Sequence, residues 1–469
     1  MAQRIVVVGA GIAGLAAAHR LRELRPAAEV LVLEASDRPG GKLRRVQVAG
    51  SWVDVGAEAM LARRPEGLDA VHAVGLDDAV IHPLTSSALL RNRGRNRRLP
   101  PRTLMGVPTD LAALREAEVV SEQTLARIAA EPDGGPYPPL TEDISVGDLV
   151  GARFGDEVVD RLVDPLLGGV YAGRAHGISV QAAVPALARR LMTEGGSLLA
   201  AAAANVSAGA RDEPGPPVFA SVSGGLARLT ETLAATGGFE VRYGVTARRI
   251  SRTASGLAVE TGPVPAPELL AADAVVVATP AGKAAQLVGS LAPVAAAELA
   301  GIETASMAIV TLAFRLPLGR SLPAGSGILI PDIEGFASKA MTFSSQKWPG
   351  VGTEDGLLLL RASLGRAGSE AVLQHPDEEL VADVRRELAE VTGLADRPVD
   401  AQVQRWGGAL PQYAVGHVDR VARIRGAVAA VPGLAVCGAS YDGVGIPACI
   451  ASAHKAADQV SAALPAEEQ

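Results

Sequence analysis

The fold of this chain is decided by Arg4-Ile5-Val6-Val7-Val8-Gly9-Ala10-Gly11-Ile12-Ala13-Gly14, which is followed by the alanine-rich stretch Leu15–Leu21. The β-branched run before the glycines is typical of a buried parallel strand, and the stretch after them favours a helix. In such a unit Gly9 permits a tight turn, Gly11 lets a pyrophosphate approach the backbone, and Gly14 lets the helix pack on the sheet. The helix N-terminus presents free N–H groups and a positive dipole end to the phosphates.

An acidic residue follows the next apolar run. Glu29–Leu33 is typical of a second strand, and Glu34 comes directly after it. A carboxylate at this place accepts hydrogen bonds from ribose hydroxyls and disfavours a 2′-phosphate. The sequence therefore predicts a Rossmann-like domain that binds FAD or NAD rather than NADP. The predicted dinucleotide contacts lie in the glycine loop and around the acid: Gly9, Ala10, Gly11, Ile12, Ala13, Gly14, Glu34 and Ala35.

Composition excludes several classes of protein. At about 150 residues per domain, a chain of 469 residues has room for about three domains. A net charge of −7 and an aromatic content of 3% argue against nucleic-acid binding. Two cysteines, Cys437 and Cys449, are too few for a disulfide framework or a four-ligand zinc site, so no metal site is expected. We expect a cytoplasmic protein whose membrane contact is peripheral at most, because no apolar run is long enough to span a bilayer.

The residues that follow Glu34 separate FAD from NAD. Arg38-Pro39-Gly40-Gly41-Lys42 and Val53-Asp54-Val55-Gly56-Ala57-Glu58 extend the nucleotide unit in a way that an NAD domain does not need. The chain here resembles the flavin-dependent porphyrinogen oxidase family, within the monoamine-oxidase-like flavoprotein superfamily. That family has a Gly-Gly-basic turn beside the pyrophosphate and a Gly-Ala turn under the flavin. The resemblance therefore implies FAD as the cofactor.

Later segments resemble the same family in the same order. Val222–Leu226 resembles its Gly-Gly turn, Val241–Ile250 is expected to be a strand, and Thr279-Pro280 follows a buried strand. Ser440–Ile450 resembles the turn that approaches the flavin ring and then starts a helix at Pro447. The resemblance implies further cofactor contacts, with Val245 touching the adenine by its backbone. These contacts are Gly41, Lys42, Gly56, Ala57, Glu58, Ala59, Val245, Trp406, Val444, Gly445 and Ile446.

These segments predict an α/β fold with a discontinuous FAD-binding domain, made of residues 1–84, 220–286 and 404–469. A mixed-sheet substrate-binding domain is expected over 85–105 and 287–403. Residues 106–219 are expected to form an inserted helical lobe, because Ala112–Ile128, Ser145–Leu167 and Val180–Leu191 have helical periodicity.

A porphyrinogen substrate carries carboxylates that need cationic anchors. Arg63 and Arg64 follow the Gly-Ala turn, and we predict that one of them binds a substrate carboxylate. Met341 is a candidate for packing against the macrocycle. Gly169-Val170-Tyr171-Ala172-Gly173 resembles a stretch that lines the family's active site, and the carbonyl of Gly169 is a candidate acceptor for a pyrrole proton. The arginine run over residues 91–98 is interpreted as a solvated hairpin edge.

The resemblance is to the Gram-positive bacterial form of the family and implies oxidation of coproporphyrinogen III to coproporphyrin III in haem biosynthesis, with oxygen as acceptor. Oxidation of protoporphyrinogen IX to protoporphyrin IX is the alternative. An amine oxidase, a carotenoid desaturase and a non-enzymatic flavin-binding chaperone are more distant alternatives. The family also implies a ferrochelatase as the partner that takes the product.

Overall fold

The computed structural model describes residues 3–85, 87–207, 217–316, 322–352 and 356–466. A five-stranded parallel sheet forms the first layer, in the order β12-β2-β1-β16-β22. Its strands come from three distant parts of the chain: β1 (Arg4–Val8), β2 (Glu29–Leu33), β12 (Glu240–Arg242), β16 (Ala274–Val277) and β22 (Leu434–Val436). In the centre, Val7 of β1 pairs with Val32 of β2 and with Val276 of β16.

The parallel sheet is covered on both faces, which explains why its strands are almost entirely apolar. Val7 and Val32 lie in the core shared with helices α1 (Ile12–Leu24), α11 (Ala227–Thr236) and α17 (Ile446–Ala463). Val6 and Leu31 point to the opposite face, toward α12 (Ala281–Val288), α13 (Pro293–Ala300) and α16 (His417–Ala429). This second face also carries the antiparallel sheet of β13 (Arg249–Thr253), β14 (Gly256–Thr261) and β15 (Glu268–Ala272).

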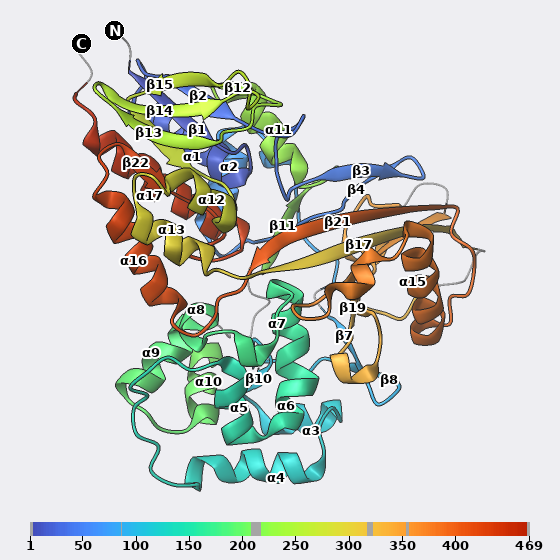
Figure 1. The fold of residues 1–469 in the computed structure, drawn as a ribbon. Helices are drawn as coiled ribbons and strands as arrows, with labels where there is room; N and C mark the ends of the chain where they lie inside the picture. Colours follow the sequence, from blue (N-terminus) through green and yellow to red (C-terminus); the bar gives the residue numbers. More distant parts are fainter. Residues whose placement is uncertain (1–2, 86, 208–216, 317–321, 353–355, 467–469) are drawn as a thin grey trace.

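A seven-stranded mixed sheet forms a second body beside the first (Figure 1). Its order is β21-β17-β20-β19-β18-β7-β8, and only the pair of β18 with β7 is parallel. The strands are β7 (Leu89–Asn92), β8 (Arg95–Arg98), β17 (Thr304–Arg315), β18 (Gly327–Leu329), β19 (Ser338–Thr342), β20 (Leu357–Leu364) and β21 (Asp400–Pro411). Helix α15 (Asp377–Thr392) packs on one face. The hairpin of β3 (Arg45–Val48) and β4 (Ser51–Asp54) packs on the other.

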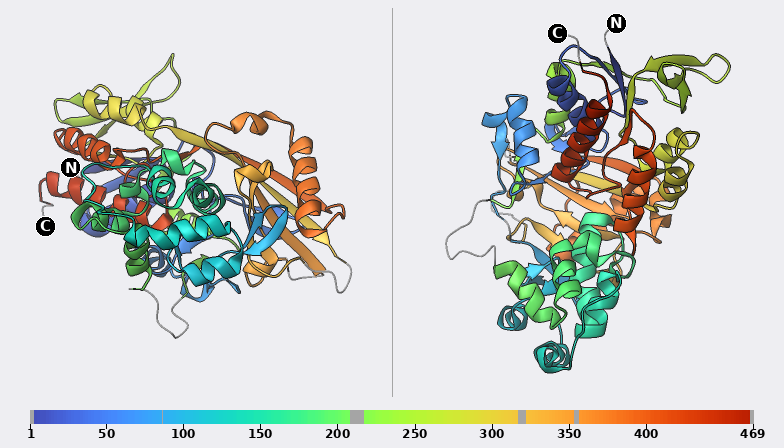
Figure 2. Two further views of the ribbon diagram at one scale, coloured as in Figure 1. Left: turned by 90° about the horizontal axis from the view of Figure 1, so that it is seen from below. Right: turned by 90° about the vertical axis from the view of Figure 1, so that its left-hand side faces the viewer.

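The helical lobe lies at the end of the molecule opposite the two termini (Figure 2). It consists of α3 (Leu111–Ala117), α4 (Glu122–Ala130), α5 (Val146–Phe154), α6 (Asp156–Val158), α7 (Asp164–Tyr171), α8 (Val180–Ala183), α9 (Pro185–Thr193) and α10 (Leu198–Ser207). A separate apolar core holds these helices together. None of the helices within the described part of the chain is long and apolar enough to cross a membrane.

The structure differs from the sequence predictions at several boundaries. The part of the C-terminal segment up to Pro411 belongs to β21, so residues 404–411 lie in the seven-stranded sheet and not in the predicted FAD-binding domain. Residues 287–302 pack against the parallel sheet, although they were expected in the substrate-binding domain. The apolar contacts of Leu287 and Leu299 decide this assignment, and periodicity along the sequence does not show them.

Four predicted elements are divided in the structure. Ser145–Leu167 is interrupted at Gly155, and Val180–Leu191 is interrupted at Val184. The single strand expected over Val241–Ile250 is split into the end of β12 and the start of β13, because Gly244 has a φ of +69° and turns the chain. The helix expected over Ala112–Ile128 is two helices, α3 and α4. Ser121 separates them and caps α4 by accepting a hydrogen bond from the Thr124 N–H. Residues 208–216, at the end of the predicted lobe, lie outside the described residues.

Gly14 tests the packing of the first helix on the glycine loop. A Cβ at Gly14 would overlap the carbonyl oxygen of Gly9. We expect Gly14→Ala to lower the free energy of unfolding of the flavin-free protein by about 2 kcal/mol or more, through overpacking. Gly282→Ala is the matched control, since Gly282 is exposed in α12 and a Cβ added there would have no neighbour within 4 Å. It should raise stability by roughly 0.5–1 kcal/mol. Equal urea midpoints for the two variants would contradict this packing.

Candidate active site

The glycine loop after β1 adopts a backbone that only glycine tolerates well. Gly9 has a φ of +106°, and a Cβ there would lie 2.9 Å from the carbonyl oxygen of Ala278. Helix α1 then begins with Gly11 as its N-cap, and no side chain caps its first N–H groups. A Cβ on Gly11 would have no neighbour within 4 Å. Free donors, a positive dipole end and open space at one point are what a pyrophosphate requires.

Glu34, the predicted ribose contact, lies directly beside the glycine loop. Its carboxylate already accepts hydrogen bonds from the N–H groups of Ala10 and Ser36, both at 2.8 Å. Each carboxylate oxygen keeps lone-pair capacity for a ribose hydroxyl. The amide N–H of Val245 donates to the Glu34 carbonyl at 2.9 Å, which leaves the Val245 carbonyl for the predicted adenine contact. Ala35 is exposed next to the acid.

The Gly-Gly-basic turn lies directly against the glycine loop. The N–H of Gly40 donates to the Ala10 carbonyl at 2.8 Å, and a Cβ on Gly41 would lie 3.3 Å from the Cα of Gly11. Lys42 follows as a half-buried cation whose pKa is lowered by burial. The turn therefore continues the path of the glycine loop along the chain, and its contact with the cofactor stays a prediction.

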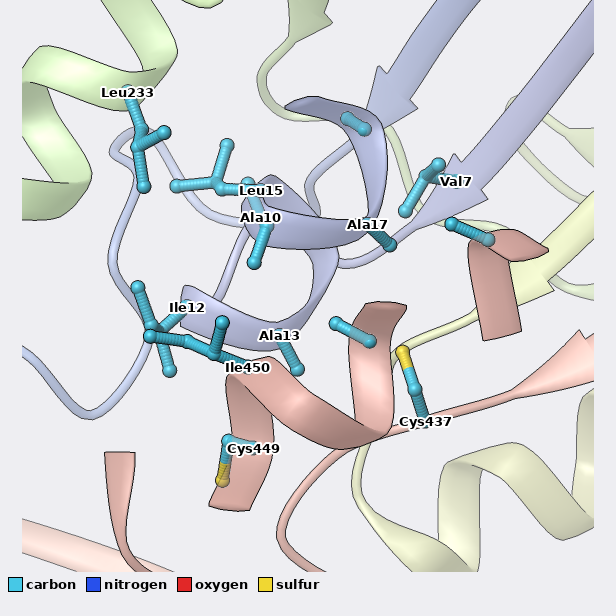
Figure 3. Close-up of a cluster of buried hydrophobic side chains, with 14 of the residues drawn as sticks. Val7, Ala10, Ile12, Ala13, Leu15, Ala17, Leu233, Cys437, Cys449 and Ile450 are labelled. Carbon is cyan, nitrogen blue, oxygen red and sulfur yellow. The ribbon is translucent and has the colours of Figure 1, made fainter. Parts of the chain in front are cut away.

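A second helix N-terminus meets the first. Helix α17 begins after Gly445, where an added Cβ would have no neighbour within 4 Å, and no side chain caps this end either. Ile12 and Ala13 of α1 pack in one apolar cluster with Cys449 and Ile450 of α17 (Figure 3). Ile446 is buried in the same cluster, whereas Val444 is half-buried against the helical lobe. Two positive helix ends thus lie on one side of the domain, where they favour an anionic ligand.

The Gly-Ala turn reaches toward the seven-stranded sheet. A Cβ on Gly56 would overlap the Lys42 carbonyl oxygen and would lie 3.3 Å from the Trp406 ring. Glu58 is the end of this turn, and its carboxylate is paired with Lys347 at 2.6 Å and with Arg361 at 2.9 Å. Burial alone would raise the pKa of Glu58, but the two cations together outweigh it and lower that pKa to about 2. Because the Glu58 side chain is held in this way, only its backbone is left for the predicted cofactor contact; Ala59 is half-buried beside it.

The predicted substrate-binding residues differ in their exposure and in their contacts. Arg63 is exposed and has no ion pair with any of the described residues, whereas the Arg64 guanidinium lies 2.6 Å from the Glu66 carboxylate. Gly169 is exposed in the last turn of α7, next to Val170, which is 39% exposed. Met341 is 1% exposed and packs in the core between β19 and α15, so the prediction that it contacts the substrate is wrong. Because side chains alternate along a strand, Met341 points to the face of the sheet that lies away from the Gly-Ala turn.

A family model described as flavin containing amine oxidoreductase matches residues 12–461. The chain belongs to this family. A coproporphyrinogen III oxidase of Mycobacterium tuberculosis is 39% identical over 98% of both chains, and one of Bacillus subtilis is 30% identical over 96% of both. A crystal structure named "Putative protoporphyrinogen oxidase" from Exiguobacterium sp. 255-15 is 30% identical, covers 98% of this chain and 99% of its own, and superposes with a TM-score of 0.86.

The chain is therefore a flavin-dependent enzyme with the α/β fold that the sequence predicted. The residues present fit a flavin nucleotide, because uncapped N–H donors, an acid at the ribose position and a Gly-Gly turn lie along one path. Among the described residues, no group of three or more His, Cys, Asp or Glu side chains is arranged to hold a metal ion.

Three residues that contact the segments of the candidate site were not predicted from the sequence. Arg361 of β20 contacts the Gly-Ala turn. Tyr413 donates from its hydroxyl to the Ala439 carbonyl at 2.6 Å and thereby holds the start of the C-terminal flavin turn. His417 stacks on Tyr413 with ring centroids 4.0 Å apart, and burial lowers its pKa to about 4, so the ring is neutral at pH 7. Only the tyrosine carried a sequence signal, since it follows the segment that begins with Trp406.

The variant Gly11→Ala distinguishes an effect on cofactor binding from an effect on folding. The open space around Gly11 means that an added methyl group costs little in the flavin-free fold, but it stands where the phosphates approach. We expect Gly11→Ala to change the melting temperature of the flavin-free protein little and to weaken binding of the flavin cofactor at least about tenfold, because a phosphate at this place would lose backbone contacts. Flavin fluorescence titration measures the affinity. Unchanged affinity would place the phosphates elsewhere.

Glu58 predicts a pH dependence of stability. Its pKa in the folded protein is about 2, below the ordinary value of 4.5, so its contribution is present above pH 4.5 and is lost as the pH falls toward 2. The stability difference between the wild-type protein and Glu58→Gln should therefore shrink by about 2 kcal/mol between pH 5 and pH 3. Urea unfolding at several pH values measures it. Asp54, whose pKa is raised to about 6 by burial, titrates in both proteins and largely cancels. A difference that is independent of pH would show that the ion pairs contribute nothing.

Proposed function

We propose that this chain oxidises coproporphyrinogen III to coproporphyrin III, with FAD as its cofactor and oxygen as the final acceptor. The observation that carries the proposal is the 39% identity, over 98% of both chains, with the Mycobacterium tuberculosis coproporphyrinogen III oxidase. The uncapped end of α1, the carboxylate of Glu34 and the Gly40-Gly41 turn support FAD rather than a shorter flavin, because they offer sites for a pyrophosphate and a ribose.

Bound FAD supplies hydride acceptance from a bridging carbon of the macrocycle, which is the chemistry that protein side chains lack. The protein residues orient the substrate and provide charge. The N-termini of α1 and α17 present uncapped N–H groups that stabilise negative charge near the cofactor. The carbonyl of Gly169 lies in the last turn of α7, where helix carbonyls lack intrahelical donors. It is proposed to accept a hydrogen bond from the pyrrole N–H, whose proton leaves to water once the hydride has been removed.

The remaining proposals concern what surrounds the reaction. The parallel sheet with its helices is proposed to bind FAD, and the seven-stranded sheet together with the helical lobe is proposed to enclose the substrate. A ferrochelatase is the proposed recipient of the porphyrin product. A cytoplasmic setting, with membrane contact that is peripheral at most, is also a proposal.

The test is a direct comparison of substrates. Purified protein with bound FAD is mixed in air with coproporphyrinogen III or protoporphyrinogen IX, and porphyrin fluorescence is followed. A higher kcat/KM for coproporphyrinogen III supports the proposal. A clear preference for protoporphyrinogen IX would overturn it in favour of the second candidate, which the name of the Exiguobacterium structure favours. Bound flavin without oxidation of either compound would overturn both.

Variants of Arg63 and Arg64 form a matched pair that tests which of the two side chains binds a substrate carboxylate. Arg63 is exposed and makes no ion pair with the described residues, but Arg64 is engaged by Glu66. We expect Arg63→Gln to raise the KM for coproporphyrinogen III about tenfold, with kcat nearly unchanged, because a charged hydrogen bond to the substrate is lost. Arg64→Gln should change KM by less than about threefold on the same reasoning. Steady-state kinetics decide, and the reverse order would assign the anchor to Arg64.

A further inference from the structure

Three consecutive residues of the Gly-Ala turn accept hydrogen bonds, through their carbonyl oxygens, from side chains of the seven-stranded sheet. Arg361 donates from Nη1 to the Asp54 carbonyl at 2.7 Å and from Nη2 to the Gly56 carbonyl at 3.0 Å. Between them, the indole Nε1 of Trp406 donates to the Val55 carbonyl at 2.7 Å. All three peptide groups are therefore oriented by side chains that belong to another body of the molecule.

Arg361 donates hydrogen bonds to three different acceptors in the Gly-Ala turn. It stands on β20, between β17 and β19, and it is only 9% exposed. Besides the two carbonyls, its Nη1 donates to the Glu58 carboxylate at 2.9 Å. A buried guanidinium is costly to desolvate unless its donors are used. Here both Nη atoms hold the two ends of a short turn, whereas the buried Nε has no partner among the described residues. Lys347 holds the other Glu58 oxygen but contacts neither carbonyl.

The turn lies on the path of the nucleotide. Starting at the open N-terminus of α1, Gly41 approaches Gly11, Lys42 follows, and the Lys42 carbonyl accepts a hydrogen bond from the Ala57 N–H at 3.3 Å. Each step moves from the phosphate end toward the seven-stranded sheet. The Gly56-Ala57 turn is thus the place where a cofactor that starts at Gly11 reaches the sheet.

We propose that Arg361 is a positioning residue that fixes the Gly56-Ala57 turn against the flavin. The proposal deepens the proposed function and rests on it for the catalytic consequence only. The carbonyl oxygens of Asp54, Val55 and Gly56 point toward the seven-stranded sheet. They therefore point away from the side of the turn on which the flavin is proposed to lie. Without Arg361 the Asp54 and Gly56 carbonyls lose their donors, and the two peptides are held only through the N–H groups of Val55 and Ala57, which donate to the Arg44 and Lys42 carbonyls at 2.9 and 3.3 Å. A carbonyl oxygen that tilts toward the flavin would oppose the negative charge gained on reduction.

The experiment uses the full chain loaded with FAD and compares Arg361→Gln with Lys347→Gln. Both variants remove one cation from Glu58, but only the first releases the two carbonyls. Arg361→Gln should weaken FAD binding about tenfold or more, alter the visible flavin spectrum and shift the flavin reduction potential to a more negative value. Lys347→Gln should leave the spectrum and the potential unchanged and keep FAD affinity within about threefold.

A milder variant guards against misfolding. Arg361→Lys keeps the charge beside Glu58 but has no planar fork to reach both carbonyls, so its spectrum and potential should lie between those of the wild-type protein and Arg361→Gln. If both Arg361 variants lower only the melting temperature, by as much as Lys347→Gln, and leave the flavin spectrum and potential unchanged, the proposal is overturned. These flavin measurements need no porphyrinogen, so a wild-type protein that binds flavin but oxidises neither substrate would refute the proposed function separately.

Discussion

The close packing of the glycine loop on the first helix is the constraint on which the rest of the structure depends. The Gly9 carbonyl occupies the space that any side chain at Gly14 would need, so α1 can start immediately behind β1. This contact keeps the first N–H groups of α1 free and directed at one point. Every other part of the candidate site is arranged around that point: the acid of Glu34, the Gly-Gly turn, and the second helix end provided by α17.

A second constraint joins the two sheets. The parallel sheet is built from three distant segments, and the seven-stranded sheet is interleaved with it in the chain (Figure 1). Besides the apolar packing of the β3–β4 hairpin on the seven-stranded sheet, the contacts between them include largely buried ion pairs, in which Glu58 from one body is paired with Lys347 and Arg361 from the other. Buried charges of this kind are stable only when every partner is present, so they specify one mutual placement rather than a range of them.

Much of the nucleotide side could be predicted from the sequence. The backbone of Gly9, Gly11 and Gly14 and the place of the Glu34 carboxylate follow from local order along the chain, which is visible in residue types and spacing; their contacts with a cofactor stay predictions. The substrate side was less predictable. Met341 looked equivalent to other apolar residues near the site, but strand alternation buries it beneath the sheet. Arg63 and Arg64 are adjacent in sequence, and only the position of Glu66 distinguishes them.

The sequence by itself determined the strand–loop–helix unit, the acid after the second strand and the family resemblance. The first two lie within a few dozen residues, where sterics and hydrogen bonding act locally, and the resemblance is carried by several short motifs in a fixed order along the chain. The tertiary structure alone decided that residues 404–411 belong to the seven-stranded sheet, that Tyr413 holds the C-terminal turn at Ala439, and that Arg361 reaches the carbonyls of Asp54 and Gly56. Arg361 and Asp54 are separated by 307 positions in the chain, so no local pattern relates them; they meet because the two bodies bury that surface together.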